Sequence, residues 1–307
     1  MSWRLLGSYV ALPTPFSAGE VDYAALERLV DWHVEQGSDG LVAVGTTGEG
    51  ATLTDYERRS VIERTIERAG RRIPVVAGIG TNNTAQSIEL ARFAQAAGAD
   101  AALVVTPYYN KPSQEGIYRH FMTVADCCPL PVMLYNIPGR CGVAIAPETV
   151  ERLARHPNVR AIKEATGSMD SASEIRQRCG ITVLSGDDSL TPSFAAVGAA
   201  GVVSVVSNLV PGRVAELCGL LAANDFRGAL EVHMALLPLS KGLLSIDVNP
   251  VPVKCALASL GLDSGAVRLP LAGASPSAAA RIHELVVAAG LAAHAAAHGA
   301  ARAGAGH

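Results

Sequence analysis

Short apolar runs alternate with longer amphipathic stretches along most of the chain. The runs VVAGI, ALVVT and VVSVV are apolar on both faces, which is typical of strands buried in a parallel sheet. We expect a strand in each of eight such runs. They cover residues 8–12, 41–44, 74–79, 101–106, 131–136, 159–163, 182–185 and 202–206.

The stretches between these runs show helical patterning and helix-start signals. Thr54 followed by Glu57 forms a capping box, and Pro147 stands where a first helical turn tolerates proline. Eight alternating units favour an α/β fold of the (β/α)8 TIM-barrel type over an open doubly wound sheet. No G-x-G-x-x-G motif follows the first strand, which weakens the dinucleotide-binding alternative. The expected helices cover residues 22–35, 54–69, 85–97, 114–126 and 147–156.

Further helical patterns follow the eighth strand and predict a C-terminal helical appendage. They cover residues 211–221, 225–244, 251–260 and 276–289. The first of them completes the barrel, and the other three are more than a barrel needs. The last residues are a low-complexity mixture of alanine, glycine and histidine. We therefore expect a catalytic barrel over residues 1–224, a helical domain over 225–292 and a disordered tail over 293–307.

Composition and charge narrow the class of protein. A barrel needs about 250 residues, so 307 residues suit one barrel with an appendage. The 49% of hydrophobic residues can fill a core, which excludes general disorder. The net charge of −3, without a basic block, argues against a nucleic-acid partner. No run approaches the roughly 18 apolar residues that span a bilayer, and early prolines argue against a signal peptide. We expect a soluble cytoplasmic enzyme without a membrane partner.

The cysteines and histidines give no sign of a metal site. None of the six cysteines forms a C-x-x-C pair, and the eight histidines include no H-E-x-x-H motif. The cysteines are therefore interpreted as reduced thiols, and no zinc or other catalytic metal is expected.

Lys163 is the strongest candidate for chemistry. It is one of only four lysines and directly follows the apolar residues of an expected strand, at the barrel end where catalytic residues gather. Burial disfavours the ammonium form and leaves a neutral amine that can attack a carbonyl, giving a Schiff base. The alternative is a lysine that extends from the strand end to solvent.

Other strand ends are also polar. Thr46 and Thr47 lie between two glycines, where backbone amides and hydroxyls suit a small carboxylate, although a glycine-rich turn would look the same. No G-K-[ST] follows, which excludes a P-loop. Tyr108, Tyr109 and Tyr135 also fall at strand ends. A tyrosine there can relay protons or simply pack.

Two further candidates are polar groups in strand-end loops. Arg140 follows an Ile-Pro-Gly turn and can fork onto a carboxylate, or it can be an ordinary solvated loop residue. Asp187 and Asp188 can serve as acid–base groups, but next to Gly186 a turn or helix cap is the better interpretation.

Seven segments together resemble one family. GTTGEGATL, TPYYNKPSQEG, YNIPGR, IKEATG, LSGDD, GVVSV and NPVPVK resemble the dihydrodipicolinate synthase (4-hydroxy-tetrahydrodipicolinate synthase) family in order and spacing, from about residue 5 to 291. The resemblance implies a barrel with a C-terminal helical domain, assembled as a homotetramer that is a dimer of dimers. It also implies a place in diaminopimelate and lysine biosynthesis, with no organic cofactor and no metal.

The resemblance also implies a role for each site residue. Lys163 would form an imine with pyruvate, and the derived enamine would attack L-aspartate 4-semialdehyde to give 4-hydroxy-tetrahydrodipicolinate. Thr46, Tyr135 and Tyr109 match the family's proton relay, with Tyr109 crossing from a neighbouring subunit. Thr47 would contact the pyruvate carboxylate and Arg140 the semialdehyde carboxylate. Gly186 and Val203 would line the pocket.

Lysine-sensitive members of the family carry a second pocket at the dimer interface. Ala51, Asn82 and Tyr108 match its residues in this chain. Gly50 replaces a serine, Asp55 and Arg58 take the places of histidines, and Gln86 replaces a glutamate. The loss of the glutamate charge and the gain of Arg58 predict weak or absent inhibition by lysine, because the ligand is a cation.

A few departures and alternatives remain. Cys141 stands where the family usually has threonine, and Asp247 and Val248 also differ, but none of these changes removes a catalytic group.

A sister enzyme, either an N-acetylneuraminate lyase or a keto-deoxy-sugar-acid aldolase or dehydratase, shares the lysine chemistry. Arg140 and the tyrosine pair favour the synthase. A non-catalytic barrel is the remaining alternative.

Overall fold

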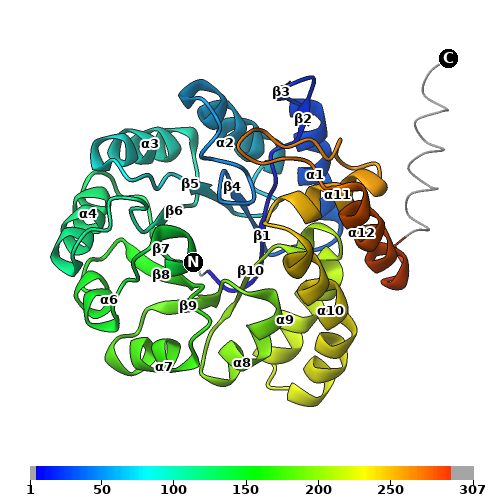
Figure 1. Ribbon diagram of the computed structural model, residues 1–307. Helices are drawn as coiled ribbons and strands as arrows, with labels where there is room; N and C mark the ends of the chain where they lie inside the picture. The colour runs from blue at the N-terminus through cyan, green and yellow to red at the C-terminus, as the bar shows by residue number, and fades with distance from the viewer. Residues whose placement is uncertain (1–4, 292–307) are drawn as a thin grey trace.

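Eight parallel strands close into a barrel in the computed structural model, which describes residues 5–291 (Figure 1). Around the barrel the hydrogen-bonded order is β1, β10, β9, β8, β7, β6, β5 and β4. The eight predicted strands are all confirmed, each within about two residues of its expected ends. They are β1 (Gly7–Ala11), β4 (Gly40–Ala43), β5 (Val75–Gly78), β6 (Ala101–Val105), β7 (Val132–Asn136), β8 (Val159–Glu164), β9 (Thr182–Ser185) and β10 (Gly201–Ser204).

Helices surround the barrel as an outer ring (Figure 1). The Thr54 capping box forms as predicted: the Glu57 amide donates to the Thr54 hydroxyl at 3.2 Å, and the Thr54 amide donates to the Glu57 carboxylate at 2.9 Å. The ring contains α1 (Tyr23–Glu35), α2 (Asp55–Ala69), α3 (Thr84–Ala97), α4 (Gln114–Asp126), α6 (Pro147–Leu153), α7 (Met169–Arg178), α8 (Thr191–Ala196) and α9 (Pro211–Ala222). Short elements are α5 (Pro138–Cys141), the 3-10 turns η1 (Asp188–Leu190) and η2 (Val206–Asn208), and the hairpin of β2 (Phe16–Ser17) and β3 (Glu20–Val21).

Three helices follow the barrel: α10 (Phe226–Ile246), α11 (Val251–Ser259) and α12 (Pro276–Ala288). Figure 1 shows α11 and α12 beside the α1 and α2 side of the barrel, so the C-terminal segment returns to the first units of the chain. The boundary at residue 224 remains our proposal for the domain division. The expected tail, residues 293–307, lies outside the described residues.

Helix α10 is the one helix in residues 5–291 that is long and apolar enough to cross a membrane by length and composition. It packs against α9 and α12, and one face buries Ala229, Val232, Leu236 and Leu243. The helix is therefore packed along one face, while Phe226, Leu230, Met234 and Leu244 are exposed.

The carboxyl end of β4 leads into a tightly packed loop. Val44 and Glu49 both have left-handed backbone angles, with φ of 57° and 51°. Gly78 at the end of β5 makes room for this loop, because a Cβ there would lie 2.3 Å from the Val44 carbonyl oxygen. The loop that carries Thr46 and Thr47 is therefore held against the neighbouring strand.

Candidate active site

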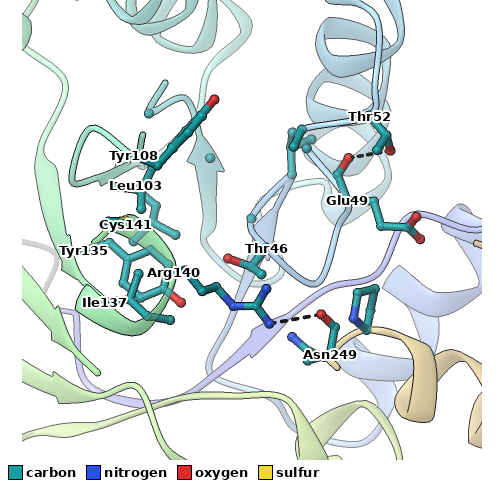
Figure 2. Close-up of a pocket in the computed structure, with 18 of the residues that line it drawn as sticks. Thr46, Glu49, Thr52, Leu103, Tyr108, Tyr135, Ile137, Arg140, Cys141 and Asn249 are labelled. Atoms are coloured by element: carbon teal, nitrogen blue, oxygen red, sulfur yellow. Dashed lines mark hydrogen bonds between the residues drawn. The ribbon is translucent and has the colours of Figure 1, made fainter. Parts of the chain in front are cut away.

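One cavity of about 330 Å³ opens at the carboxyl ends of the strands, where TIM barrels carry their chemistry (Figure 2). The loop after β4, the ends of β5, β6 and β7, helix α5 and the C-terminal segment all contribute to its wall. Its polar and charged lining comes from Thr46, Glu49, Thr52, Arg58, Tyr108, Tyr135, Arg140 and Asn249.

Lys163 and Tyr135 lie next to each other beneath this cavity. They are register partners on β8 and β7, and the Lys163 Nζ is 4.4 Å from the centre of the Tyr135 ring. Tyr135 lines the cavity, whereas Lys163 is only 5% exposed and lies behind that lining. The strand pairing thus brings the predicted nucleophile against the predicted proton-transfer residue.

The two threonines of the GTTGEG loop differ in their surroundings. Thr46 lines the cavity, and its carbonyl accepts from the Glu49 amide at 3.1 Å. Thr47 is buried, and its hydroxyl accepts from the Asn249 side-chain amide at 3.0 Å. A residue of the C-terminal segment therefore holds Thr47 in place.

Arg140 reaches the same C-terminal residue. Its Nη2 donates to the Asn249 carbonyl at 3.1 Å, the contact drawn as a dashed line in Figure 2. Arg140 is exposed, and in Figure 2 its guanidinium extends past Tyr135 toward Asn249. Asn249 therefore contacts both Thr47 and Arg140. Asn249 was not predicted as a site residue, although it begins the NPVPVK segment that resembles the family.

A buried ion pair stabilises this arrangement from below. Lys254 is completely buried, and its Nζ donates to Glu49 at 2.8 Å and to the Thr14 carbonyl at 2.7 Å. The other Glu49 oxygen accepts from the Arg268 amide at 3.0 Å. Lys254 and Glu49 satisfy each other, as buried charges must. The pair fixes the loop of Thr46 and Thr47 to the C-terminal helices.

Asp187 and Asp188 are close enough to Lys163 to interact with its charge, and Glu164 follows Lys163 in β8. Burial raises the pKa of Asp187 and of Asp188, and the charge of Lys163 acts in the opposite direction on both. Asp188 accepts from the amides of Val205 and Val206, at 2.9 and 3.1 Å, so it supports a turn. Burial also raises the pKa of Glu164. The interpretation of Asp188 as a structural group agrees with these bonds.

Other predicted site residues are not part of the cavity lining. Tyr109 is 90% exposed and has a left-handed backbone with φ of 71°. Val203 is buried in β10, and Gly186 donates its amide to the Glu164 carbonyl at 2.7 Å. Neither these three residues nor Thr47 belongs to the lining within the described chain.

Some of the residues predicted for a second pocket line this cavity, and others lie outside its lining. Ala51 and Tyr108 line the cavity, and so does Arg58, which replaces a histidine of lysine-sensitive proteins. Asn82 and Gln86 are half-buried outside the lining, and the Asn82 carbonyl accepts from Asn110 at 3.4 Å. In residues 5–291 no three His, Cys, Asp or Glu side chains converge as they would around a metal ion.

Comparison with known proteins gives a consistent result. Residues 4–289 match the dihydrodipicolinate synthetase family. The 4-hydroxy-tetrahydrodipicolinate synthase of Pelobacter propionicus is 51% identical over 268 residues, which is 87% of this chain and 92% of that protein. The crystal structure of dihydrodipicolinate synthase from Aquifex aeolicus superposes with a TM-score of 0.92 at 47% identity, covering 94% of this chain and 99% of the other.

A third similar protein bears on assembly. A dihydrodipicolinate synthase variant described as the first monomeric one is 39% identical, with a TM-score of 0.90 over 93% of this chain and 97% of that one. Fold, strand-end motifs and sequence identity agree over nearly the whole length. This chain belongs to the dihydrodipicolinate synthetase family.

Proposed function

We propose that the protein is a lyase-type synthase that condenses pyruvate with L-aspartate 4-semialdehyde to give 4-hydroxy-tetrahydrodipicolinate. The observation that carries the proposal is the Lys163 amine, buried 4.4 Å from the Tyr135 ring beneath a cavity that Thr46 and Arg140 also line. Relatives that are about half identical carry the name of this activity. The reaction serves diaminopimelate and lysine biosynthesis, and we assign it to the cytoplasm.

The first half of the reaction builds a nucleophile. After it has lost a proton, the Lys163 amine attacks the ketone carbon of pyruvate, and the adduct loses water to form an imine. Loss of a methyl proton then gives an enamine, with the imine nitrogen taking up the electron pair. Because the imine itself accepts these electrons, the proposal needs no organic cofactor and no metal.

The second half closes the ring. The enamine carbon attacks the aldehyde carbon of the semialdehyde, and the aldehyde oxygen takes a proton to become the hydroxyl group. The semialdehyde amine then attacks the imine carbon, and Lys163 leaves as the free amine. One water is released in total. We assign the proton transfers to Thr46, Tyr135 and Tyr109.

The remaining residues bind carboxylates and shape the pocket. Thr47 is assigned to the pyruvate carboxylate and Arg140 to the semialdehyde carboxylate, since a guanidinium fork suits two oxygens. Gly186 and Val203 are assigned to the wall next to the imine. The buried Thr47 would have to share its hydroxyl between Asn249 and the substrate, which a hydroxyl can do because it both donates and accepts.

The position of Tyr109 supports an assembled enzyme. A relay tyrosine that is 90% exposed in one subunit can complete the site of a neighbour. We propose a homotetramer built as a dimer of dimers, in which the dimer is the smallest unit with complete sites. A solved relative described as the first monomeric variant implies that related synthases assemble.

Trapping of the imine tests the proposal directly. Borohydride with pyruvate should leave a stable adduct on Lys163 and on none of the other three lysines, as read by peptide mass spectrometry. Lys163→Arg should abolish turnover because a guanidinium stays protonated, while the matched control Lys241→Arg, at an exposed position of α10, should not. An adduct elsewhere, or none, would refute the mechanism. Aspartate semialdehyde should outperform N-acetylmannosamine and glyceraldehyde as the second substrate.

A further inference from the structure

Asp187 is an acid beside Lys163 whose carboxylate has no bonded partner in the described chain. Lys163 is the register partner of Leu184 in β9, and Asp187 follows in the loop just after the carboxyl end of that strand. Tyr135 on β7 and Asp187 after β9 therefore stand on the two sides of the strand that carries Lys163. Among residues 5–291 the Asp187 carboxylate forms no hydrogen bond and no ion pair.

The loop of Asp187 is held by backbone groups. Asp187 lies in a turn, as expected, and stands at the N-terminal cap of η1, but its side chain forms no capping bond. Its amide donates to the Ser185 hydroxyl at 3.2 Å, and its carbonyl accepts from the same hydroxyl at 2.8 Å. The turn is thus fixed without the carboxylate, so a substitution of the Asp187 side chain should leave the loop intact.

The other two acids near Lys163 are already engaged. Asp188 accepts from two backbone amides and from a serine hydroxyl. Glu164 accepts from the Asn136 side-chain amide at 3.0 Å and from the Thr166 amide at 2.9 Å. Hydrogen bonds of this kind occupy a carboxylate. The remaining acid next to the nucleophile is therefore the one that is free to bind a ligand.

The charges around Asp187 suit a group that takes up a proton. Burial raises the pKa of Asp187, and the charge of Lys163 acts in the opposite direction. Glu164 lies near enough for its charge and that of Asp187 to repel each other. A cationic ligand would offset this repulsion, and a carboxylate with a raised pKa is a stronger base than an exposed one.

The proposed reaction requires such an anion. The semialdehyde carries an ammonium group, and only the neutral amine has the electron pair that attacks the imine. The residues assigned to the substrates offer hydroxyls and cationic or amine groups, but no anion. Glu49 lines the cavity, yet its two oxygens accept from Lys254 and from the Arg268 amide. Because the ring closes at the Lys163 nitrogen, a group that acts on the amine must lie beside that nitrogen.

We propose that Asp187 binds the ammonium group of the semialdehyde and takes one of its protons for ring closure. The inference rests on the proposed function and adds the base for its last step. The freed electron pair forms the bond from nitrogen to the imine carbon, and the π pair moves onto the Lys163 nitrogen. Asp187 then gives its proton to the Lys163 nitrogen and takes another from the attacking nitrogen. The bond to Lys163 breaks, and the electron pair of the attacking nitrogen completes the C=N bond of the ring.

Succinic semialdehyde separates this role from a general one, because it has the aldehyde and the carboxylate of the substrate but no amine. In the full-length protein Asp187→Asn should lower kcat with aspartate semialdehyde at least about 10²-fold, as expected for loss of a general base. Competitive inhibition by succinic semialdehyde should be the same in the variant and the wild type. The matched control Asp170→Asn, at an exposed position in the first turn of α7, should behave like the wild type.

Two further measurements follow the same step. In Asp187→Asn ring closure becomes slow, so borohydride should trap the uncyclised adduct of pyruvate and aspartate semialdehyde on Lys163, as read by peptide mass spectrometry. In the wild type the adduct of pyruvate alone should predominate. Asp187→Glu keeps a carboxylate and should retain more turnover than Asp187→Asn.

Three results would overturn the assignment of Asp187. They are wild-type turnover in Asp187→Asn, an equal loss of turnover and of succinic semialdehyde inhibition, and loss of the pyruvate adduct in the variant, which would mean that Asp187 acts on Lys163 instead. The wild type separates this failure from that of the proposed function. If the wild type makes no product from aspartate semialdehyde, both are refuted. If the wild type makes product, any of the three results refutes the assignment of Asp187 alone.

Discussion

Tyr135 and Lys163 are register partners on two adjacent strands of a closed barrel, with the Lys163 Nζ 4.4 Å from the Tyr135 ring centre. Both side chains are buried. Because backbone hydrogen bonds join the two strands, their separation is fixed before any substrate arrives. Such fixed geometry is a large part of what an enzyme contributes to a reaction in which one residue attacks and another moves protons.

Removal of the Tyr135 hydroxyl tests its part in proton transfer. Tyr135→Phe should lower kcat by about 10²–10⁴-fold, the range for general acid–base groups. The pyruvate adduct should still form with borohydride, because the ring that packs against Lys163 remains. Steady-state kinetics checks the first point, with Tyr118→Phe on the outer helix α4 as control. A decrease of less than about threefold would make Tyr135 a packing residue.

Arg140 should matter more for the second substrate than for the first. Arg140→Ala removes a carboxylate fork and should raise the KM for aspartate semialdehyde about tenfold or more. Imine formation with pyruvate should persist. The comparison is between the KM values of the two substrates, and Arg155→Ala, in the turn just after α6, serves as control. An equal loss for both substrates would contradict the assignment.

Subunit mixing tests the position of Tyr109. Tyr109→Phe and Lys163→Arg should each be nearly inactive alone. If Tyr109 acts across a subunit boundary, a hybrid dimer regains one complete site, with Lys163 from one chain and Tyr109 from the other. We therefore expect activity to reappear when the two variants are dissociated and reassociated together. A fully active monomer, or no recovery in verified hybrids, would rule out the shared site.

Lysine should inhibit weakly or not at all. Gln86 lacks the charge that would pair with an ammonium group, and the buried Arg58 adds a cation to the cavity wall. Initial rates against lysine concentration at fixed substrates should show half-inhibition well above about 0.1 mM. The double variant Arg58→His with Gln86→Glu should become more sensitive. Half-inhibition of the wild type below that concentration would show that these two positions do not decide the response.

Glu57 gives the fold a defined response to acid. The guanidinium of Arg268 donates to both Glu57 oxygens, at 2.6 and 2.8 Å, and lowers the pKa of this carboxyl from 4.5 to about 2. The folded state therefore favours the ionised Glu57 carboxylate more than the unfolded state does. This contribution to the stability of the fold is present above pH 4.5 and is lost as the pH falls toward 2.

Substitution at Glu57 isolates this contribution. Glu57→Gln retains capping-box geometry but loses the ion pair, so it should lower the free energy of unfolding at pH 7 by about 1–2 kcal/mol. The difference from wild type should shrink between pH 4.5 and 2. Thermal melts across that range provide the measurement, with Glu67→Gln on the same helix as control. A difference that does not depend on pH would mean that the ion pair is not its source.

Much of the fold could be predicted because a buried parallel strand has a simple sequence signature. Runs such as VVAG in β5 are buried on both faces, and each predicted run became a strand. Helix α7 was not predicted: its sequence is mostly polar, and only Ala172 and Ile175 are buried, so its apolar stripe is too narrow to stand out. The hairpin of β2 and β3 has only two residues per strand, too few for a pattern.

The site was predictable only in part, because local sequence patterns do not show contacts between distant residues. Tyr135, Thr46 and Arg140 are polar residues at strand ends, and the barrel brings them to one cavity. The bond between Asn249 and Thr47 joins residues 202 positions apart, and no local signal predicts such a pairing. The family resemblance places Arg58 at a second pocket, but helical periodicity alone does not show that the cavity reaches its side chain.

The buried pair of Glu49 and Lys254 also affects how the protein is made. The partners are 205 residues apart, so at 5–20 residues per second the ribosome adds Lys254 about 10–40 s after Glu49. Until then the loop with Thr46 and Thr47 lacks its anchor, and Glu49 must stay hydrated. The loop is synthesised early, but it reaches its final conformation only after Lys254 has been added. A nascent chain can therefore hold most of its barrel while it is still unable to bind substrate.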